Sequence, residues 1–297
     1  MNGLGVGVVQ MAMGPSAPHN IETARRLVIR AASMGARIIL LPELYKTPYF
    51  CTVEDVAHFD LAEPLEGESF AAFSPVAREQ GVWIVVPIFE RRAAGIYHNS
   101  VILIGPDGTR QGLYRKTHIP DDPGFHEKHY FTPGDLGYPV FDVGGIKVAV
   151  LICWDQWYPE AARLVALKGA QVIFYPTAIG WTPSEKEGEG AMQHDAWRTV
   201  QRGHAVANGL TVAVANRCGY EPTPGGEGIE FWGGSFIAGP MGEIVAEAGE
   251  EETVLVTTVD PAASERIRRI WPFFRDRRID LFGPLTQRFI DDEEPRP

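Results

Sequence analysis

Two kinds of apolar pattern alternate along the chain and predict an α/β fold. Runs of branched apolar residues, typical of strands buried on both faces, occupy 4–10, 36–42, 82–89, 97–104, 146–152, 169–177 and 211–216. Further strands are expected near 231–237, 243–247 and 253–259. Helical spacing predicts helices over 21–34, 68–80, 159–167 and 192–208, with Asn20 capping the first. Residues 112–138 fit neither pattern and are expected to form a long irregular segment, which usually has a function.

Two segments of the chain recur at a constant offset of 134 residues. Gly35–Pro42 (GARIILLP) is similar to Gly169–Pro176 (GAQVIFYP), and Val101–Gly108 (VILIGPDG) is similar to Ser235–Gly242 (SFIAGPMG). No linker separates the two halves. We therefore predict a single domain over residues 1–270, built as a four-layer α-β-β-α sandwich with two internally similar halves.

Residues 271–297 are expected to form an extension beyond this domain. The stretch Trp271–Arg278 (WPFFRDRR) is rich in aromatic residues and arginine, which are enriched at protein interfaces. One interpretation is an extension that docks on a partner subunit of a homo-oligomer. The other is a tail that packs on its own domain, and the sequence leaves both open.

Composition narrows the class of protein. The 297 residues are 45% hydrophobic and 22% charged, as in ordinary globular chains, and the net charge of −11 argues against nucleic-acid binding. Three cysteines do not indicate a disulfide framework in a chain of this length. No apolar run is long enough to span a membrane, and no basic leader with a long apolar run precedes residue 4. We expect a cytoplasmic protein with reduced thiols and no membrane partner.

The strand over residues 146–152 leads directly into Cys153, and Pro159 then suits the first turn of a helix. A cysteine at such a strand-to-helix turn lies where the sheet edge opens and backbone N–H groups point outward. Nucleophiles of acyl-transfer enzymes occupy this kind of position. A buried core thiol is the alternative, because free cysteine is among the most buried residue types.

Two other residues complete a set for thiol acyl chemistry. Glu43 follows the strand 36–42, which stops at Pro42 because proline cannot donate to the ladder. Lys116 lies in the long irregular segment. Such chemistry needs a base for the thiol, a cation or N–H donors for the oxyanion, and a nucleophile at an open edge. A surface carboxylate and a solvated lysine are the structural alternatives for these two residues.

The sequences around these residues resemble the nitrilase superfamily of carbon–nitrogen hydrolases over nearly the whole chain. The three signature blocks are Leu41–Glu43 (LPE), Tyr114–Pro120 (YRKTHIP) and Ile152–Asp155 (ICWD). The resemblance implies hydrolysis of a non-peptide C–N bond without a cofactor. Glu43 is then the base, Cys153 the nucleophile that forms a thioester-like intermediate, and Lys116 with the Trp154 backbone N–H the oxyanion donors.

The resemblance also implies a second glutamate near the catalytic lysine. Glu127 in His126–Phe131 (HEKHYF) matches that position and would orient the lysine or the substrate. The two histidines that flank Glu127 do not have metal-ligand spacing, because H-E-x-x-H needs the second histidine one residue later. We therefore expect no metal site.

Within the family, the local blocks are most similar to enzymes that act on carbamoyl amines. The resemblance implies that relatives acting on N-carbamoyl amino acids hold the substrate carboxylate with an arginine just after the nucleophile. Here Gln156 and Trp157 occupy that region. Glu185 is the expected partner of a distal amine, although an exposed charged loop is equally consistent. The expected substrate-binding residues are Tyr49, Trp154, Trp157, Ala178, Trp181 and Glu185.

Three alternatives remain open at this point. The substrate could be another N-carbamoyl compound, such as a β-ureido acid or an N-carbamoyl amino acid. It could also be a simple amide or a nitrile, which the same three residues can attack. The third alternative is a non-catalytic member that keeps the fold as a binding module, and retention of all three chemically active residues argues against it.

Overall fold

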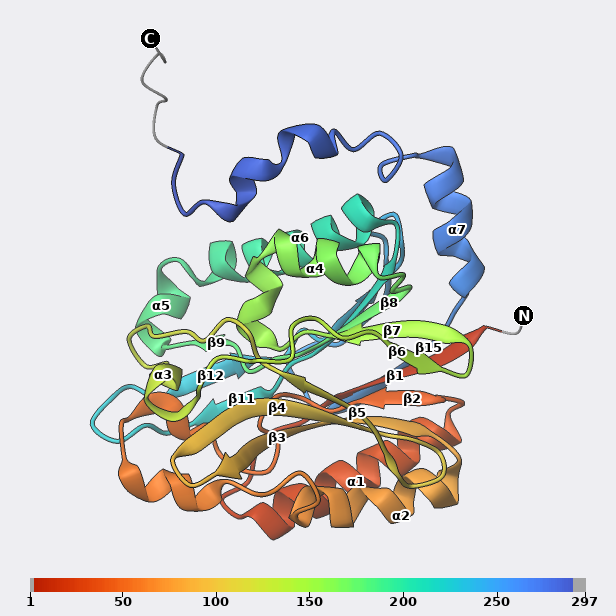
Figure 1. Ribbon diagram of the computed structural model, residues 1–297. Coiled ribbons are helices and arrows are strands. Elements are labelled where there is room, and N and C mark those ends of the chain that lie inside the picture. Colours follow the sequence, from red (N-terminus) through yellow and green to blue (C-terminus); the bar gives the residue numbers. More distant parts are fainter. Residues whose placement is uncertain (1–2, 291–297) are drawn as a thin grey trace.

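The computed structural model describes residues 3–290, and it contains two large sheets that pack face to face between two layers of helices (Figure 1). The first sheet has the order β15-β1-β2-β3-β4-β5. Its strands are β1 (Leu4–Gln10), β2 (Ile38–Leu40), β3 (Trp83–Ala93), β4 (Ile96–Ile104), β5 (Arg110–Arg115) and β15 (Thr253–Val259). Helices α1 (Ala17–Ser33) and α2 (Glu68–Gln80) cover its outer face.

The second sheet has the order β6-β7-β8-β10-β13-β14. Its strands are β6 (Phe141–Val143), β7 (Ile146–Val150), β8 (Val172–Pro176), β10 (Thr211–Ala215), β13 (Phe236–Ala238) and β14 (Ile244–Glu247). Helices α4 (Pro159–Leu167) and α6 (Gly190–Asn208) form the fourth layer. The predicted four-layer α-β-β-α sandwich is therefore confirmed.

The two sheets share one topology, which accounts for the repeat in the sequence. In each sheet three neighbouring strands are parallel (β1-β2-β3 and β7-β8-β10), and antiparallel strands flank them on both sides. Parallel strands buried between layers need branched apolar residues throughout, because neither face meets water. Both halves contribute to the main hydrophobic core between the sheets, which includes Val8, Leu40, Val150 and Phe174.

Smaller elements lie at one end of the sandwich, around the chain segments that leave the parallel strands. A three-stranded sheet has the order β11-β12-β9 and contains β9 (Gly180–Trp181), β11 (Cys218–Glu221) and β12 (Ile229–Trp232). Two short helices, α3 (Glu127–Tyr130) and α5 (Pro183–Glu187), flank it. These elements enclose the carboxyl ends of β2, β7 and β8, where ligands bind in α/β folds.

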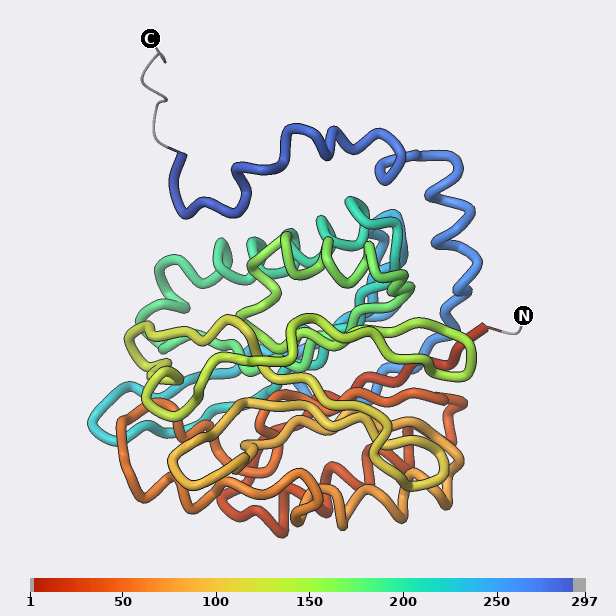
Figure 2. The backbone as a smooth tube through the Cα atoms, viewed as in Figure 1, coloured from red at the N-terminus to blue at the C-terminus, as the bar shows by residue number. Residues whose placement is uncertain are grey.

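The C-terminal part of the chain leaves the first sheet after β15, through α7 (Pro261–Ile270), and then runs along the outside of α4 and α6 (Figure 2). Phe274 packs between the guanidinium groups of Arg163 and Arg268, at 5.1 and 4.6 Å from its ring centre. The last seven residues of the predicted extension, 291–297, lie outside the described residues. Every helix in the described range is too short or too polar to cross a lipid bilayer.

Several sequence expectations about individual elements were wrong. Asn20 does not cap a helix: α1 begins earlier, at Ala17, and the buried Asn20 amide instead bonds the backbone of Gly14 and Lys46. Residues 112–115 are strand rather than irregular, since β5 pairs with β4. The single strand expected over 231–237 is two strands in different sheets, because Gly233 and Gly234 both adopt positive φ.

The helix layer over the second sheet depends on Trp197, which is completely buried. Its ring packs against Trp232 and Phe236, and its indole nitrogen donates to the Gln156 side chain at 3.1 Å. We predict that Trp197→Ala lowers the free energy of unfolding by about 3–5 kcal/mol, because it leaves a large cavity. The measurement is urea denaturation, with Met192→Ala on the same helix as the exposed control. A loss below about 1 kcal/mol would contradict this packing.

Candidate active site

Cys153 lies at a strained turn just beyond the end of β7. It opens a 3₁₀ turn over Cys153–Trp157, and its φ of +40° is disfavoured for a residue with a side chain. The residue is 5% exposed, and its Sγ lies 4.0 Å from the backbone oxygen of Ala178. The same strain recurs at Leu44, whose φ is +49° and which directly follows Glu43. Both candidate reactive residues therefore lie where the chain turns sharply out of a parallel strand.

The buried carboxylate of Asp155 connects the turn at Cys153 to the segment that carries Lys116. One of its oxygens accepts hydrogen bonds from the backbone N–H of Ile152 at 2.9 Å and from the Tyr114 hydroxyl at 2.6 Å. Its other oxygen accepts from the backbone N–H of His118 at 2.9 Å and contacts the imidazole Nδ1 at 2.7 Å. Because Tyr114 and His118 stand two residues on either side of Lys116, this carboxylate fixes the lysine relative to the thiol.

Lys116 is fully buried and makes ion pairs with two carboxylates. Its Nζ lies 2.8 Å from Glu43 Oε1 and 2.7 Å from Glu127 Oε2, and both glutamates are buried as well. The Tyr49 hydroxyl donates to the other oxygen of Glu127 at 2.8 Å, and the Asn99 amide donates to Glu43 at 2.7 Å. A buried ammonium needs such partners, since an unpaired buried charge is strongly unfavourable.

Burial and these charges shift the pKa values of three groups. Burial raises the pKa of the Cys153 thiol well above its usual range, and Glu43 raises it further, whereas Lys116 lowers it. Burial alone would lower the pKa of Lys116, but Glu127 and Glu43 together raise it by more. Burial also raises the pKa of Glu127, against the opposing effect of Lys116. The resting site therefore holds a neutral thiol beside a charged lysine.

One oxygen of the Glu43 carboxylate has no partner among the described residues. Oε1 is bonded to Lys116 and Asn99, whereas Oε2 is buried without a hydrogen bond. The backbone of Glu43 is held in place by Arg217, whose Nε donates to its carbonyl at 3.1 Å and whose Nη1 bonds Glu221 at 2.9 Å. A fixed, buried carboxylate with a free oxygen is suited to accept a proton from a ligand, a water or a thiol.

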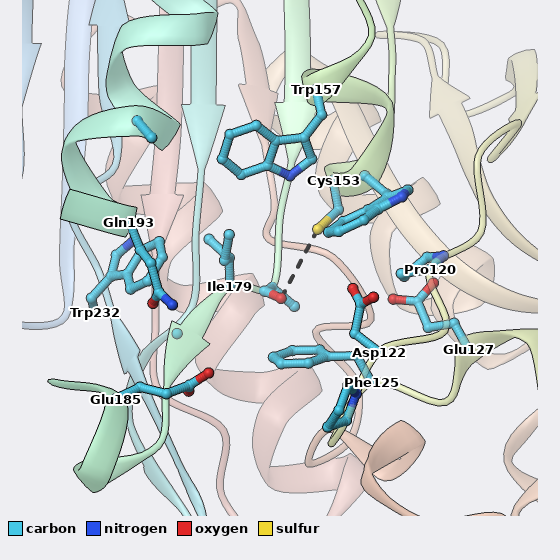
Figure 3. A pocket seen from close by; sticks show the side chains of 15 residues that line it. Pro120, Asp122, Phe125, Glu127, Cys153, Trp157, Ile179, Glu185, Gln193 and Trp232 are labelled. Carbon is cyan, nitrogen blue, oxygen red and sulfur yellow. Dashed lines mark hydrogen bonds between the residues drawn. The ribbon is translucent and has the colours of Figure 1, made fainter. Parts of the chain in front are cut away.

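A cavity of about 500 Å³ opens beside these residues (Figure 3). Cys153 and Glu127 form one side of it, and Glu185, Gln193 and Trp232 lie across from them. Among residues 3–290, its lining includes three carboxylates, of which Glu127 is paired with Lys116, and no lysine, arginine or histidine. The lining residues are Pro120, Asp122, Pro123, Phe125, Glu127, Cys153, Trp154, Trp157, Ala178, Ile179, Gly180, Glu185, Gln193, Ala196 and Trp232. A negatively charged, largely apolar cavity favours a ligand with an alkyl body and a cationic group.

The structure brings most of the residues expected from the sequence into this site. Glu43, Lys116 and Glu127 meet in one ion-paired cluster, and Cys153 opens onto the cavity. Of the expected substrate-binding residues, four line the cavity: Trp154, Trp157, Ala178 and Glu185.

Two of the expected substrate-binding residues lie elsewhere. Trp181 packs behind the lining on Trp232, and Tyr49 contacts Glu127 instead of the cavity.

Sequence reasoning missed Asp122, Phe125, Gln193 and Trp232 among the lining residues. Asp122 and Phe125 belong to the long irregular segment already singled out, so their position between Lys116 and Glu127 was an available signal. Gln193 and Trp232 carried no comparable signal. Gln193 lies on α6 and Trp232 on β12, and only the packing of these elements brings the two side chains to the cavity.

The histidines beside Glu127 do not converge on a common point. His126 lies 3.8 Å from Asp121, and His129 lies 3.9 Å from Glu54. Within residues 3–290, no group of three or more His, Cys, Asp or Glu side chains is arranged to hold a metal ion.

The raised thiol pKa leads to a prediction about the reactivity of Cys153. We expect its alkylation by iodoacetamide in Glu43→Gln, where the neighbouring carboxylate cannot take the proton, to rise about tenfold per pH unit. The sign follows from burial, the largest cause, which keeps the thiol protonated until the pH approaches its raised pKa. Peptide mass spectrometry at Cys153 measures the rate and separates it from the other cysteines. A plateau at or below about pH 8 would contradict the effect of burial on the thiol pKa, because Glu43→Gln already removes the part of the rise that Glu43 causes.

Comparison with known proteins agrees with this geometry. Residues 5–269 match the family model "Carbon-nitrogen hydrolase". The chain is 47% identical to the N-carbamoylputrescine amidase of Solanum lycopersicum, over 98% of this chain and 96% of that protein. It is 38% identical to the citrullinase of Francisella tularensis subsp. tularensis, over 97% of this chain and 100% of that protein.

Solved structures give the same assignment. A carbon-nitrogen hydrolase from Helicobacter pylori G27 superposes with a TM-score of 0.94 at 45% identity, covering 97% of this chain and 99% of that one. The family model spans most of the chain, and these relatives align with the chain over almost its whole length. The chain therefore belongs to the carbon-nitrogen hydrolase family.

Proposed function

We propose that this protein hydrolyses N-carbamoylputrescine to putrescine, ammonia and carbon dioxide. The observation that carries the substrate assignment is the charge of the cavity: besides Glu127, which is paired with Lys116, its lining has the carboxylates of Asp122 and Glu185 and no basic side chain among the described residues. N-carbamoylputrescine has a neutral ureido end, a four-carbon chain and an ammonium end, so it matches an apolar cavity with a negative potential. The similarity to a plant N-carbamoylputrescine amidase supports the same assignment.

In the first half of the proposed reaction, Cys153 attacks the ureido carbonyl carbon. The free oxygen of Glu43 takes the thiol proton as the sulfur–carbon bond forms. The oxyanion accepts hydrogen bonds from the Lys116 ammonium and from the backbone N–H of Trp154, at the start of a 3₁₀ turn where N–H groups have no partner within the helix. Glu43 then gives its proton to the departing nitrogen, and ammonia leaves.

The second half of the proposed reaction releases the diamine. The intermediate is a carbamoyl thioester on Cys153 that retains the substituted nitrogen. Water attacks this carbonyl while Glu43 accepts its proton, and collapse of the tetrahedral intermediate restores the Cys153 thiol. The product is an N-carboxylated amine, which takes up a proton and loses carbon dioxide to give putrescine.

The other site residues have supporting roles in this proposal. Glu127, bonded to both Lys116 and Tyr49, orients the lysine and compensates its charge in the absence of solvent. Trp154, Trp157 and Ala178 form the wall along the alkyl chain. Glu185 on the far wall adds to the negative potential that attracts the ammonium end, and Trp181 supports this wall from behind.

The second candidate is hydrolysis of a ureido acid, and the similarity to a citrullinase favours it. Such a substrate carries a carboxylate that needs a cationic or N–H partner. Two cavity-lining tryptophans, Trp157 and Trp232, have buried indole nitrogens without a hydrogen-bond partner among the described residues. Neutral N–H donors offset a carboxylate less well than an arginine, so we rank this candidate below the carbamoyl diamine.

The test is ammonia release by the purified protein. We expect kcat/KM for N-carbamoylputrescine to exceed that for N-carbamoyl-β-alanine and for citrulline by about tenfold or more, since one charge-assisted contact is worth about 1.5–3 kcal/mol. Cys153→Ala is expected to lose activity on all three compounds, because Cys153 is the only thiol among the described residues that line the cavity.

Cys218→Ala is the matched control, since this second buried thiol lies outside the cavity lining. Preference for either acid would move the protein to the second candidate. Undiminished activity of Cys153→Ala would overturn the nucleophile assignment.

A homo-oligomer is the final part of the proposal. The C-terminal segment presents several exposed apolar side chains in sequence: Ile279, Leu281, Leu285, Phe289 and Ile290. Exposed apolar patches of this kind usually mark sites that a partner covers. Residues 271–297 would dock on a second copy of the chain. The three free cysteines suit a reducing compartment such as the cytoplasm.

Light scattering coupled to size-exclusion chromatography tests the oligomer. We expect the intact chain to elute as a dimer or larger assembly, and Leu281→Ser with Leu285→Ser to shift it toward the monomer. Met192→Ser, at an exposed position on α6, is the control. A monomeric intact chain would contradict this part of the proposal.

A further inference from the structure

Asp122 lies in the cavity wall on the segment between Lys116 and Glu127. Its carboxylate points into the cavity, on the same side as Glu127 and facing the region below Cys153 (Figure 3). Neither its residue type nor a motif singled it out in the sequence. It lies on the short segment between Lys116 and Glu127, and both of these residues are held in the ion-paired cluster.

The turn that carries Asp122 is tied to the ion-paired cluster. The backbones of Asp122 and Phe125 bond each other in both directions, at 3.3 and 2.8 Å. The Phe125 ring packs 5.6 Å from the Tyr49 ring, and the Tyr49 hydroxyl donates to Glu127. Asp122 is therefore held on a fixed turn, which is what a selective contact requires.

The three acids of this region differ in what their carboxylates already bind. Glu185 is exposed, and its carboxylate accepts the Thr182 backbone N–H at 2.7 Å as part of the α5 cap. Asp121 is not one of the lining residues, and its carboxylate lies 3.8 Å from His126. Among the contacts of residues 3–290, the Asp122 side chain has neither an ion pair nor a hydrogen bond, and the cavity supplies no cation to it.

We propose that Asp122 is the specificity-determining residue that binds the ammonium group of the substrate. This inference rests on the proposed function, because it identifies the contact that separates a carbamoyl diamine from a neutral or acidic ureido compound. A carboxylate facing a partly desolvated cavity gains a charge-assisted hydrogen bond only from a cationic ligand. A ligand without the ammonium group leaves Asp122 unpaired and is disfavoured in the same cavity.

The test compares two ligands of equal length, N-carbamoylputrescine and N-pentylurea, in which a methyl group replaces the ammonium. Binding is measured by calorimetry in Cys153→Ala, so that turnover does not interfere. Asp122→Asn in that background is expected to reduce the preference for N-carbamoylputrescine over N-pentylurea by about 10- to 100-fold, the loss of one charge-assisted contact. Glu185→Gln is expected to change the preference by less, because its carboxylate is engaged in the helix cap.

Asp121→Asn is the matched control, since it makes the same change of charge one residue away and outside the cavity lining. The inference is overturned if Asp122→Asn changes the preference for N-carbamoylputrescine over N-pentylurea by less than about threefold relative to Cys153→Ala alone. It is also overturned if Asp121→Asn changes this preference as much as Asp122→Asn does. Lack of any preference for N-carbamoylputrescine in the parent overturns it as well.

The proposed function fails on a separate measurement, namely the absence of ammonia release from N-carbamoylputrescine by the wild-type protein. In steady state, Asp122→Asn should raise KM for N-carbamoylputrescine far more than it changes kcat. An equal fall in kcat/KM for both compounds would assign Asp122 to the ureido end or to the fold, and would overturn its role in selecting the amine.

Discussion

Lys116 carries its charge with no solvent exposure, between the carboxylates of Glu43 and Glu127. A lone buried ammonium is unstable, and removing one partner of a buried pair typically costs about 3–5 kcal/mol. The three side chains therefore constrain one another. The same group of charges raises the pKa of the neighbouring Cys153 thiol beyond the effect of burial, so the thiol must lose its proton to a base at the moment of attack. The proposed chemistry depends on this coupling.

The fold delivers these groups from both of its halves. Glu43 leaves β2 of the first sheet, and Cys153 follows β7 of the second, so the reactive residues meet at one end of the sandwich. Two buried side chains join the halves there. Arg217, beyond β10, bonds the backbone of Glu43, and Asp155 bonds both flanks of the Lys116 segment. The strained backbone at Cys153 is maintained because these contacts over-determine it.

Much of this arrangement could be predicted from the sequence, because parallel strands need continuous apolar runs and the two halves repeat. Glu43 and Cys153 were marked because each follows a predicted strand. Lys116 lies in a segment that was expected to be irregular, and the resemblance of its sequence block to the nitrilase superfamily marked it instead. Residues placed by tertiary packing escaped prediction. Trp232 reaches the cavity from a short strand of a third sheet. Asn20 has the residue type of a helix cap, but it lies inside α1, where its side chain bonds the backbone of Lys46. Local patterns hold no information about such contacts.

The proposed mechanism requires that Cys153 forms a thioester with the substrate carbonyl and that ammonia leaves before the diamine. Rapid acid quenching during turnover of N-carbamoylputrescine, followed by mass spectrometry of the Cys153 peptide, tests it most directly. We expect a modified Cys153 that carries the carbonyl group together with the diamine. An adduct on a different residue, or a Cys153 adduct that has already lost the diamine, would contradict it.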